Sequence, residues 1–165
     1  MTTPASIGKH PVHPMLVVIP MGLWVFSLVA DLFSTAGGGG VWKIIALYTM
    51  GGGIAGALIA AVPGLIDFFS LKESHIRYLA RYHMFVNLTA TGIFAADFYL
   101  RVSNSQQGFL PLALSIFAIA VIGVGGWLGG ELVYVQGVGA VPPAAQRRHA
   151  PELRAIPGGR ARRVV

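Results

Sequence analysis

Four long apolar stretches alternate with short polar segments along the chain. Apolar side chains dominate residues 14–33, 41–69, 79–100 and 109–135. Each stretch reaches the roughly 20 residues that a helix needs to cross about 30 Å of hydrocarbon, and a lipid bilayer has no water to satisfy free backbone groups. The pattern therefore predicts an all-α fold, an integral membrane four-helix up-down bundle over residues 14–135.

The segments between the stretches are short and are either polar or rich in glycine. Glycines 37–40 separate the first two stretches, charged residues 71–81 the next two, and residues 104–108 the last two. Residues 1–13 are predicted to form an N-terminal segment. Residues 136–165 are predicted to form a basic flexible tail, because their Gly, Pro and Arg content leaves too little apolar surface to fold alone. No internal repeat is visible beyond the four stretches.

The composition excludes several classes of protein. Of the 165 residues, 55% are apolar and only 11% are charged, whereas soluble domains carry about 25% charged residues. A soluble enzyme and a disordered chain are therefore excluded. There is no cysteine, which excludes disulfides, cysteine-ligated clusters and covalently attached c-type haem. Six of the nine arginines lie beyond residue 146, so the net charge of +6 describes a basic tail and not a nucleic-acid-binding domain.

Lysine and arginine are distributed unequally between the two sides of the predicted bundle. The N-terminal segment, the charged segment 71–81 and the tail together carry ten of them, whereas the opposite side carries only Lys43 and Arg101. Because cytoplasmic loops carry the excess of basic residues, the chain is predicted to lie in the bacterial inner membrane with both termini cytoplasmic. Asp31 and Asp97 then lie near the outer ends of their helices, beside water.

Ionisable side chains inside the predicted helices are the main functional signal. His13, Asp67, His83 and Glu131 come one from each helix, and the topology brings all four toward the cytoplasmic side. A charge within a bilayer costs at least a few kcal/mol, so such residues indicate function by default. A purely structural interpretation is also open, in which His13 caps a helix, Asp67 is solvated and Glu131 pairs with a loop arginine.

The third predicted helix carries a polar face. His83 is followed by Asn87, Thr91 and Phe94, and spacings of three and four place residues on one side of a helix. Because lipid does not accommodate this polarity, the face is predicted to point into the bundle.

Two kinds of cofactor suit this constellation, since bundle cores commonly hold cofactors between facing helices. In the first interpretation, His13 and His83 ligate the iron of haem b, glycine-rich helix faces make room for the porphyrin, and Arg77 and Arg81 pair with its propionates. In the second, nitrogen and carboxylate ligands hold zinc or non-haem iron. For haem, His10 and His75 are the substitute ligands. In the second interpretation, His10, His13 and His83 bind the metal together with Asp67 or Glu131.

Residues 8–142 resemble the bacterial predicted membrane proteins of domain-of-unknown-function family 2231. The resemblance rests on residues 10–14 (HPVHP), residues 64–67 (GLID), His83 with Asn87, and residues 126–134 (GWLGGELVY). It implies four transmembrane helices. It also implies a redox setting, because some relatives are joined to Rieske iron–sulfur or cytochrome c domains, and this raises the expectation of haem.

The sequence thus predicts a b-type cytochrome-like protein that transfers electrons within the membrane. Asn87 and Glu131 are expected to orient an imidazole, and Trp127 and Tyr134 to line the pocket or to anchor the chain at the interface. The alternatives are a non-catalytic accessory subunit of a larger respiratory or photosynthetic complex, and a haem-free zinc or iron protein. The expected partners are the lipid bilayer and other membrane subunits or a redox partner, without nucleic acid.

Overall fold

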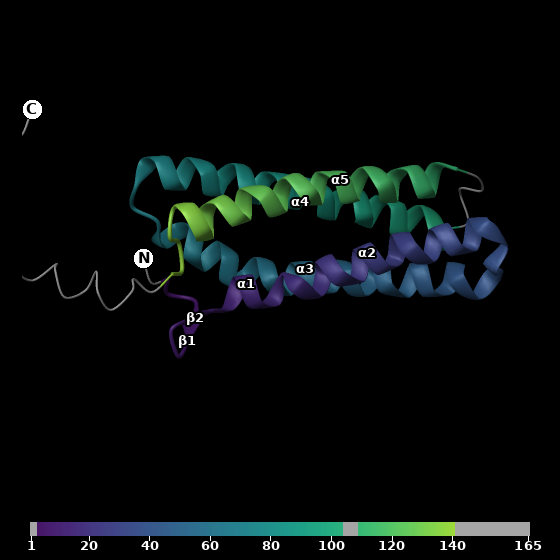
Figure 1. Cartoon of the computed structure of the whole chain (residues 1–165), viewed down its shortest axis with the longest axis horizontal. Coiled ribbons are helices and arrows are strands. Elements are labelled where there is room, and N and C mark those ends of the chain that lie inside the picture. The colour runs from purple at the N-terminus through teal and green to yellow at the C-terminus, as the bar shows by residue number, and fades with distance from the viewer. Residues whose placement is uncertain (1–2, 104–108, 141–165) are drawn as a thin grey trace, which may run out of the picture.

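The computed structural model describes residues 3–103 and 109–140, and this part of the chain consists mainly of long helices lying side by side (Figure 1). About 84% of it is helical. In chain order, the α-helices are α1, Val12–Leu16; α2, Val18–Phe33; α3, Gly40–Ser70; α4, Ser74–Val102; and α5, Leu110–Gly130. Single π-helical turns, Ser34–Gly38 and Glu131–Val135, extend α2 and α5.

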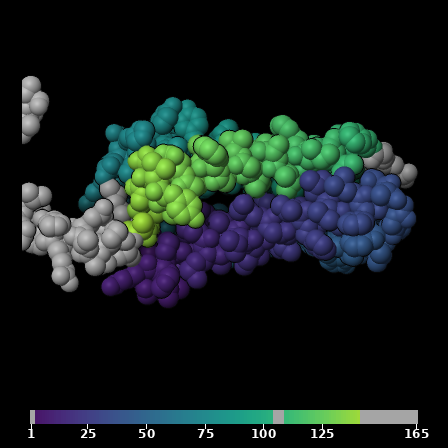
Figure 2. All heavy atoms as spheres, in the orientation of Figure 1, coloured from purple at the N-terminus to yellow at the C-terminus, as the bar shows by residue number. Residues whose placement is uncertain are grey.

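The helices run in two directions. Helices α1, α2 and α4 run from the end that holds the N-terminal segment toward the opposite end, and α3 and α5 run back (Figure 1). Helix α2 packs along α3, and α4 packs along α5, so the chain forms two helical hairpins. Contacts of α3 with α4 and of α2 with α5 join the hairpins. Figure 2 shows the two hairpins as two parallel layers of atoms.

Three segments are long and apolar enough to cross a membrane: Val12–Gly38, Gly40–Ser70 and Leu110–Val135. Helix α4 has the length but a lower mean hydropathy, because polar residues such as His83, Asn87 and Asp97 lie within it. By length and composition, the described part of the chain therefore has three candidate spans, and the predicted fourth span is not among them.

An aromatic pair lies at the centre of the molecule. The rings of Trp24 on α2 and Phe94 on α4 stack with their centroids 4.4 Å apart, and both side chains are buried. Helix α3 approaches closely beside them, because a Cβ atom on Gly53 would lie only 2.4 Å from Nε1 of Trp24. Glycine thus allows α2 and α3 to approach closely at this point.

A short antiparallel hairpin precedes the helices and departs from the purely helical prediction. Strands β1 (Ser6–Ile7) and β2 (His10–Pro11) pair through the register Ser6 with Pro11. Gly8 and Lys9 between them both have positive φ, as a tight two-residue hairpin turn requires. The backbone N–H of Ala5 donates to Oδ1 of Asp67 at 2.9 Å, which ties this segment to the end of α3.

The helix ends depart from the predicted boundaries mainly in α4. Helix α3 follows the predicted stretch 41–69 closely, whereas α4 begins at Ser74, within the charged segment, because charged side chains exposed to water do not interrupt a helix. Gly37 and Gly39 adopt positive φ, a conformation that glycine accepts without steric cost, and they reverse the chain between α2 and α3. Of the predicted basic tail, residues 136–140 are described, and residues 141–165 lie outside the described part of the chain.

Candidate functional site

Two histidines from different helical hairpins meet inside the molecule. His13 lies in α1 and His83 lies nine residues into α4. Their ring centroids are 6.1 Å apart, and the ring planes are nearly perpendicular, at 89°. Both side chains are half-buried. The structure therefore brings together the two imidazoles that the sequence singles out as the best ligand pair.

Each imidazole is held by a backbone carbonyl of its own hairpin. Nδ1 of His13 lies 2.7 Å from the carbonyl oxygen of Ala60 on α3. Nδ1 of His83 lies 3.0 Å from the carbonyl oxygen of Gly125 on α5. A carbonyl oxygen only accepts hydrogen bonds, so Nδ1 carries the proton in both rings.

The other nitrogen of each ring is consequently without a proton. In a neutral imidazole that is protonated at Nδ1, Nε2 has a free lone pair. Among the described residues, no hydrogen bond engages Nε2 of His13 or His83. This arrangement is that of a metal-binding histidine, whose second nitrogen donates to a carbonyl and fixes the tautomer and the orientation of the ring.

Asn87 lies against His83, one helical turn further along α4. Its Nδ2 donates to the backbone carbonyl of His83 at 2.7 Å and lies 3.3 Å from Nδ1 of the same residue. The amide also fills the space beside Gly125, where a Cβ atom would lie 2.8 Å from it. Asn87 therefore packs beside both the histidine ring and Gly125.

The other predicted site residues lie elsewhere. Asp67 accepts the hydrogen bond from Ala5 described above. Glu131 accepts a hydrogen bond from Gln136 at 3.1 Å, and Nε of Arg77 donates to the carbonyl of Leu71 at 2.9 Å. The remaining side chains are exposed: His10, His75, Arg81, Trp127 and Tyr134.

Two roles were predicted for Trp127 and Tyr134, lining the pocket or anchoring the chain at the membrane interface, and their exposure bears on both. Trp127 is 80% exposed and Tyr134 is 88% exposed, so both point away from the protein interior. This placement suits an anchor at a membrane interface and does not line a pocket around the histidine pair.

The three-ligand metal site is not assembled in the described part of the chain. Residues 3–103 and 109–140 contain no group of three or more His, Cys, Asp or Glu side chains close enough to hold one metal ion. The pair of His13 and His83 therefore gains no third ligand from Asp67, Glu131 or His10 in this arrangement.

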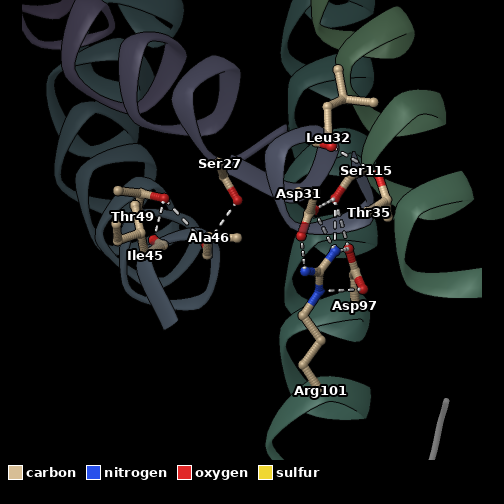
Figure 3. A network of polar contacts seen from close by, with 10 residues as sticks. All are labelled: Ser27, Asp31, Leu32, Thr35, Ile45, Ala46, Thr49, Asp97, Arg101 and Ser115. Carbon is tan, nitrogen blue, oxygen red and sulfur yellow. Dashed lines mark hydrogen bonds and ion pairs between the residues drawn. The ribbon is translucent and has the colours of Figure 1, made fainter. Parts of the chain in front are cut away.

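A second polar site joins three helices at the opposite end of the molecule (Figure 3). The guanidinium of Arg101 on α4 donates to Asp31 on α2 through Nη1 at 2.6 Å and Nη2 at 2.8 Å. It also donates to Asp97, one turn before it on α4, through Nε and Nη2, both at 3.0 Å. Ser115 of α5 donates to Asp97 at 3.0 Å. We call Asp31, Asp97, Arg101 and Ser115 the arginine cluster.

The arginine cluster is deeply buried and fully bonded. The side chain of Asp97 has no exposed surface, and those of Asp31 and Arg101 are 8% and 14% exposed. Bidentate hydrogen bonds between arginine and carboxylate are among the strongest charge-assisted hydrogen bonds. Arg101 forms hydrogen bonds with both carboxylates, although its single positive charge can neutralise only one of them. Removing any one of these charged groups would therefore leave the others buried without a full set of partners.

Sequence reasoning missed the role of Arg101 and Ser115. Arg101 entered only as one of the few basic residues on its side of the membrane. The available signal was the spacing of four between Asp97 and Arg101, which pairs opposite charges on one helical face. Nothing local in the sequence connects these residues with Asp31, which is 70 residues away from Arg101.

Apolar helices with polar groups buried between them define the class as helical membrane proteins. The chain matches the family described as Predicted membrane protein (DUF2231) over residues 9–142, and it belongs to that family. No curated protein and no solved structure matches the chain.

Proposed function

We propose that this protein is a small b-type cytochrome of the membrane, in which His13 and His83 hold haem iron and the protein passes electrons within the bilayer. The observation that supports this proposal is the meeting of two imidazoles from separate hairpins, 6.1 Å apart, each fixed by a carbonyl at Nδ1 with Nε2 left free.

The number of donors favours haem over a bare metal ion. Structural zinc takes four protein ligands and catalytic zinc at least three, whereas only two convergent donors are available among the described residues. Haem iron needs only two axial ligands from the protein, because the porphyrin supplies the other four. The two imidazoles lie with their ring centroids 6.1 Å apart, and each would offer one Nε2 lone pair to such an iron.

The chain's own groups would tune such a cofactor. The carbonyls of Ala60 and Gly125 hold the Nδ1 protons, which increases the basicity of Nε2 as a ligand. Asn87 donates to the backbone carbonyl of His83 and packs against its ring. The bound haem would supply a one-electron carrier, since none of these side chains can carry an electron reversibly alone.

The proposed cytochrome spans the membrane four times as an up-down bundle. Between Tyr82 and Tyr99 on α4, every exposed side chain is uncharged, and the charged Asp97 points inward. The two tyrosines are 48% and 69% exposed and are separated by about 25 Å along a helix, which suits anchors at two membrane interfaces. Low hydropathy in α4 thus reflects polar groups that face the protein and not the lipid.

The proposed topology predicts the labelling of single cysteines, which the cysteine-free chain makes possible. Lys43→Cys and Val102→Cys are expected to react with a membrane-impermeant maleimide added outside intact cells. Lys72→Cys is expected to react only after permeabilisation. Labelling of Lys72→Cys and Val102→Cys from the same side would contradict the α4 crossing. Labelling of Lys72→Cys alone from outside would contradict cytoplasmic termini.

An optical spectrum of the detergent-purified protein tests the cofactor. After expression with sufficient haem, we expect a Soret band and, on reduction with dithionite, the sharp α band of a six-coordinate b-type haem. A colourless protein that co-purifies with a respiratory or photosynthetic complex would contradict this proposal and favour an accessory subunit. A colourless protein with stoichiometric zinc or iron would contradict it in favour of a haem-free metal site.

A further inference from the structure

Three side-chain pairs cross the centre of the molecule between the parallel helices α1–α2 and α4. They are the histidine pair His13 with His83, the stacked pair Trp24 with Phe94, and the ion pair Asp31 with Arg101. In each pair the two residues are 70 positions apart in the sequence. The inward-facing residues of α1–α2, which begin the first hairpin, therefore correspond to those of α4, which begins the second, at a constant offset of 70.

Helices α3 and α5, which end the two hairpins, also have equivalent inward-facing positions, at an offset of 65 residues. Ala60 and Gly125 present the two carbonyls that hold the histidines. Gly64 and Gly129, each one turn later, lie against the same two rings. Further equivalent positions that are buried in both hairpins are Pro20 with Ala90, Ser27 with Asp97, Met50 with Ser115, Gly53 with Ala118, and Asp67 with Leu132.

We infer that the chain consists of two equivalent helical hairpins, related by an approximate two-fold axis parallel to the helices, and that Gly64 and Gly129 are matched positioning residues for one ligand on that axis. Each hairpin contributes a histidine socket, which we define as Ala60 with Gly64 for His13 and Gly125 with Gly129 for His83. The identity of the ligand rests on the proposed function, whereas the equivalence of the sockets does not.

The pairs at the two ends of the axis differ in their chemistry. At one end the equivalent residues are complementary, since Asp31 meets Arg101 and the two bond directly. At the other end they are identical, since His13 meets His83 with two free lone pairs. Identical lone pairs at equivalent positions suit a ligand that meets both in the same way, and under the proposed function that ligand is one metal centre on the axis.

The sockets are too tight for any side chain. A Cβ atom on Gly64 would lie 2.7 Å from Nδ1 and 2.9 Å from Cε1 of His13. A Cβ atom on Gly129 would lie 2.9 Å from Cε1 of His83. Because these contacts fall below ordinary van der Waals distance, alanine at either position requires the ring or the helix to shift.

The chain provides a matched pair of control glycines. Gly22 on α2 and Gly92 on α4 are also equivalent at the offset of 70, and a Cβ atom at either meets nothing within 4 Å. Gly22→Ala and Gly92→Ala therefore carry the same change in helix propensity without touching a histidine.

The first measurement compares haem affinity in the four variants. Gly64→Ala and Gly129→Ala are expected to lower haem affinity by similar factors of about 10–100, which is the usual cost of losing the group that orients a metal ligand. Gly22→Ala and Gly92→Ala are expected to retain the wild-type affinity. A loss confined to one socket variant, or shared by the controls, would overturn the equivalence.

The second measurement is independent of haem. In haem-free protein labelled with ¹⁵N-histidine, the imidazole signals of His13 and His83, assigned with His13→Gln and His83→Gln, are expected to show protonation at Nδ1. Gly64→Ala is expected to shift only the His13 signals, and Gly129→Ala only those of His83. Unchanged signals in both variants would overturn the sockets. If these imidazole shifts are observed but the protein binds no haem, the histidine sockets stand and the proposed cytochrome function is rejected.

Discussion

Replacing Arg101 with alanine is expected to lower the free energy of unfolding by about 3–5 kcal/mol, because breaking a buried ion pair leaves an uncompensated charge. Asp31 and Asp97 would face each other with their charges unneutralised, and Asp97 has no exposed surface through which water could compensate. Since Asp31 lies on α2, Asp97 on α4 and Ser115 on α5, the loss is expected to loosen three helices together.

Unfolding of the purified protein in mixed micelles measures this effect. Lys43→Ala is the control, because it removes an exposed cation at the same end of the molecule and is expected to change stability by less than about 0.5 kcal/mol. The stability of Arg101→Lys is expected to lie between those of Arg101→Ala and Lys43→Ala, since lysine cannot form bidentate hydrogen bonds to two carboxylates. An Arg101→Ala variant as stable as Lys43→Ala would contradict the described cluster.

Replacing either His13 or His83 with alanine is expected to abolish bound haem of the six-coordinate type. In the proposed site each histidine would supply one ligand to the haem iron, and no third His, Cys, Asp or Glu joins the pair among the described residues. His10→Ala and His75→Ala are the controls, because both side chains are exposed and were alternative ligands from sequence alone.

The optical spectrum of these four variants decides the ligand assignment. Loss of the α band in His13→Ala and His83→Ala, with retention in His10→Ala and His75→Ala, is the expected pattern. An intact spectrum in His83→Ala would show that another residue ligates the iron. Loss of the band in His75→Ala would place the haem at the exposed start of α4 instead.

The hydrophobic pattern was sufficient to predict the long helices, because their length depends on local composition. The predicted stretch 41–69 corresponds to α3, Gly40–Ser70. The inward face of α4 was also predictable, since His83, Asn87 and Phe94 recur at helical spacing and the structure turns all three toward the other helices. Helical periodicity determines which side chains share one face of a helix, and this does not depend on which residues pack against that face.

The partners across the molecule were not predictable from local pattern. The bonds of Arg101 to Asp31 depend on the register of α4 against α2, which is set by the packing of the two hairpins against each other. The hairpin repeat was also missed, since residue types differ at most of the equivalent positions: Trp24 corresponds to Phe94, and Asp31 to Arg101. The repeated property is which positions are buried, and burial becomes visible only in three dimensions.

The electron paramagnetic resonance spectrum of the oxidised, haem-loaded protein tests most directly whether His13 and His83 share one iron. The two ring planes cross at 89°, and crossed imidazoles on ferric haem give a low-spin signal of the highly anisotropic type. We expect that signal, with its loss in His13→Ala and in His83→Ala. A high-spin signal from the wild-type protein would mean that the two imidazoles do not bind the same iron, and would contradict the proposed site.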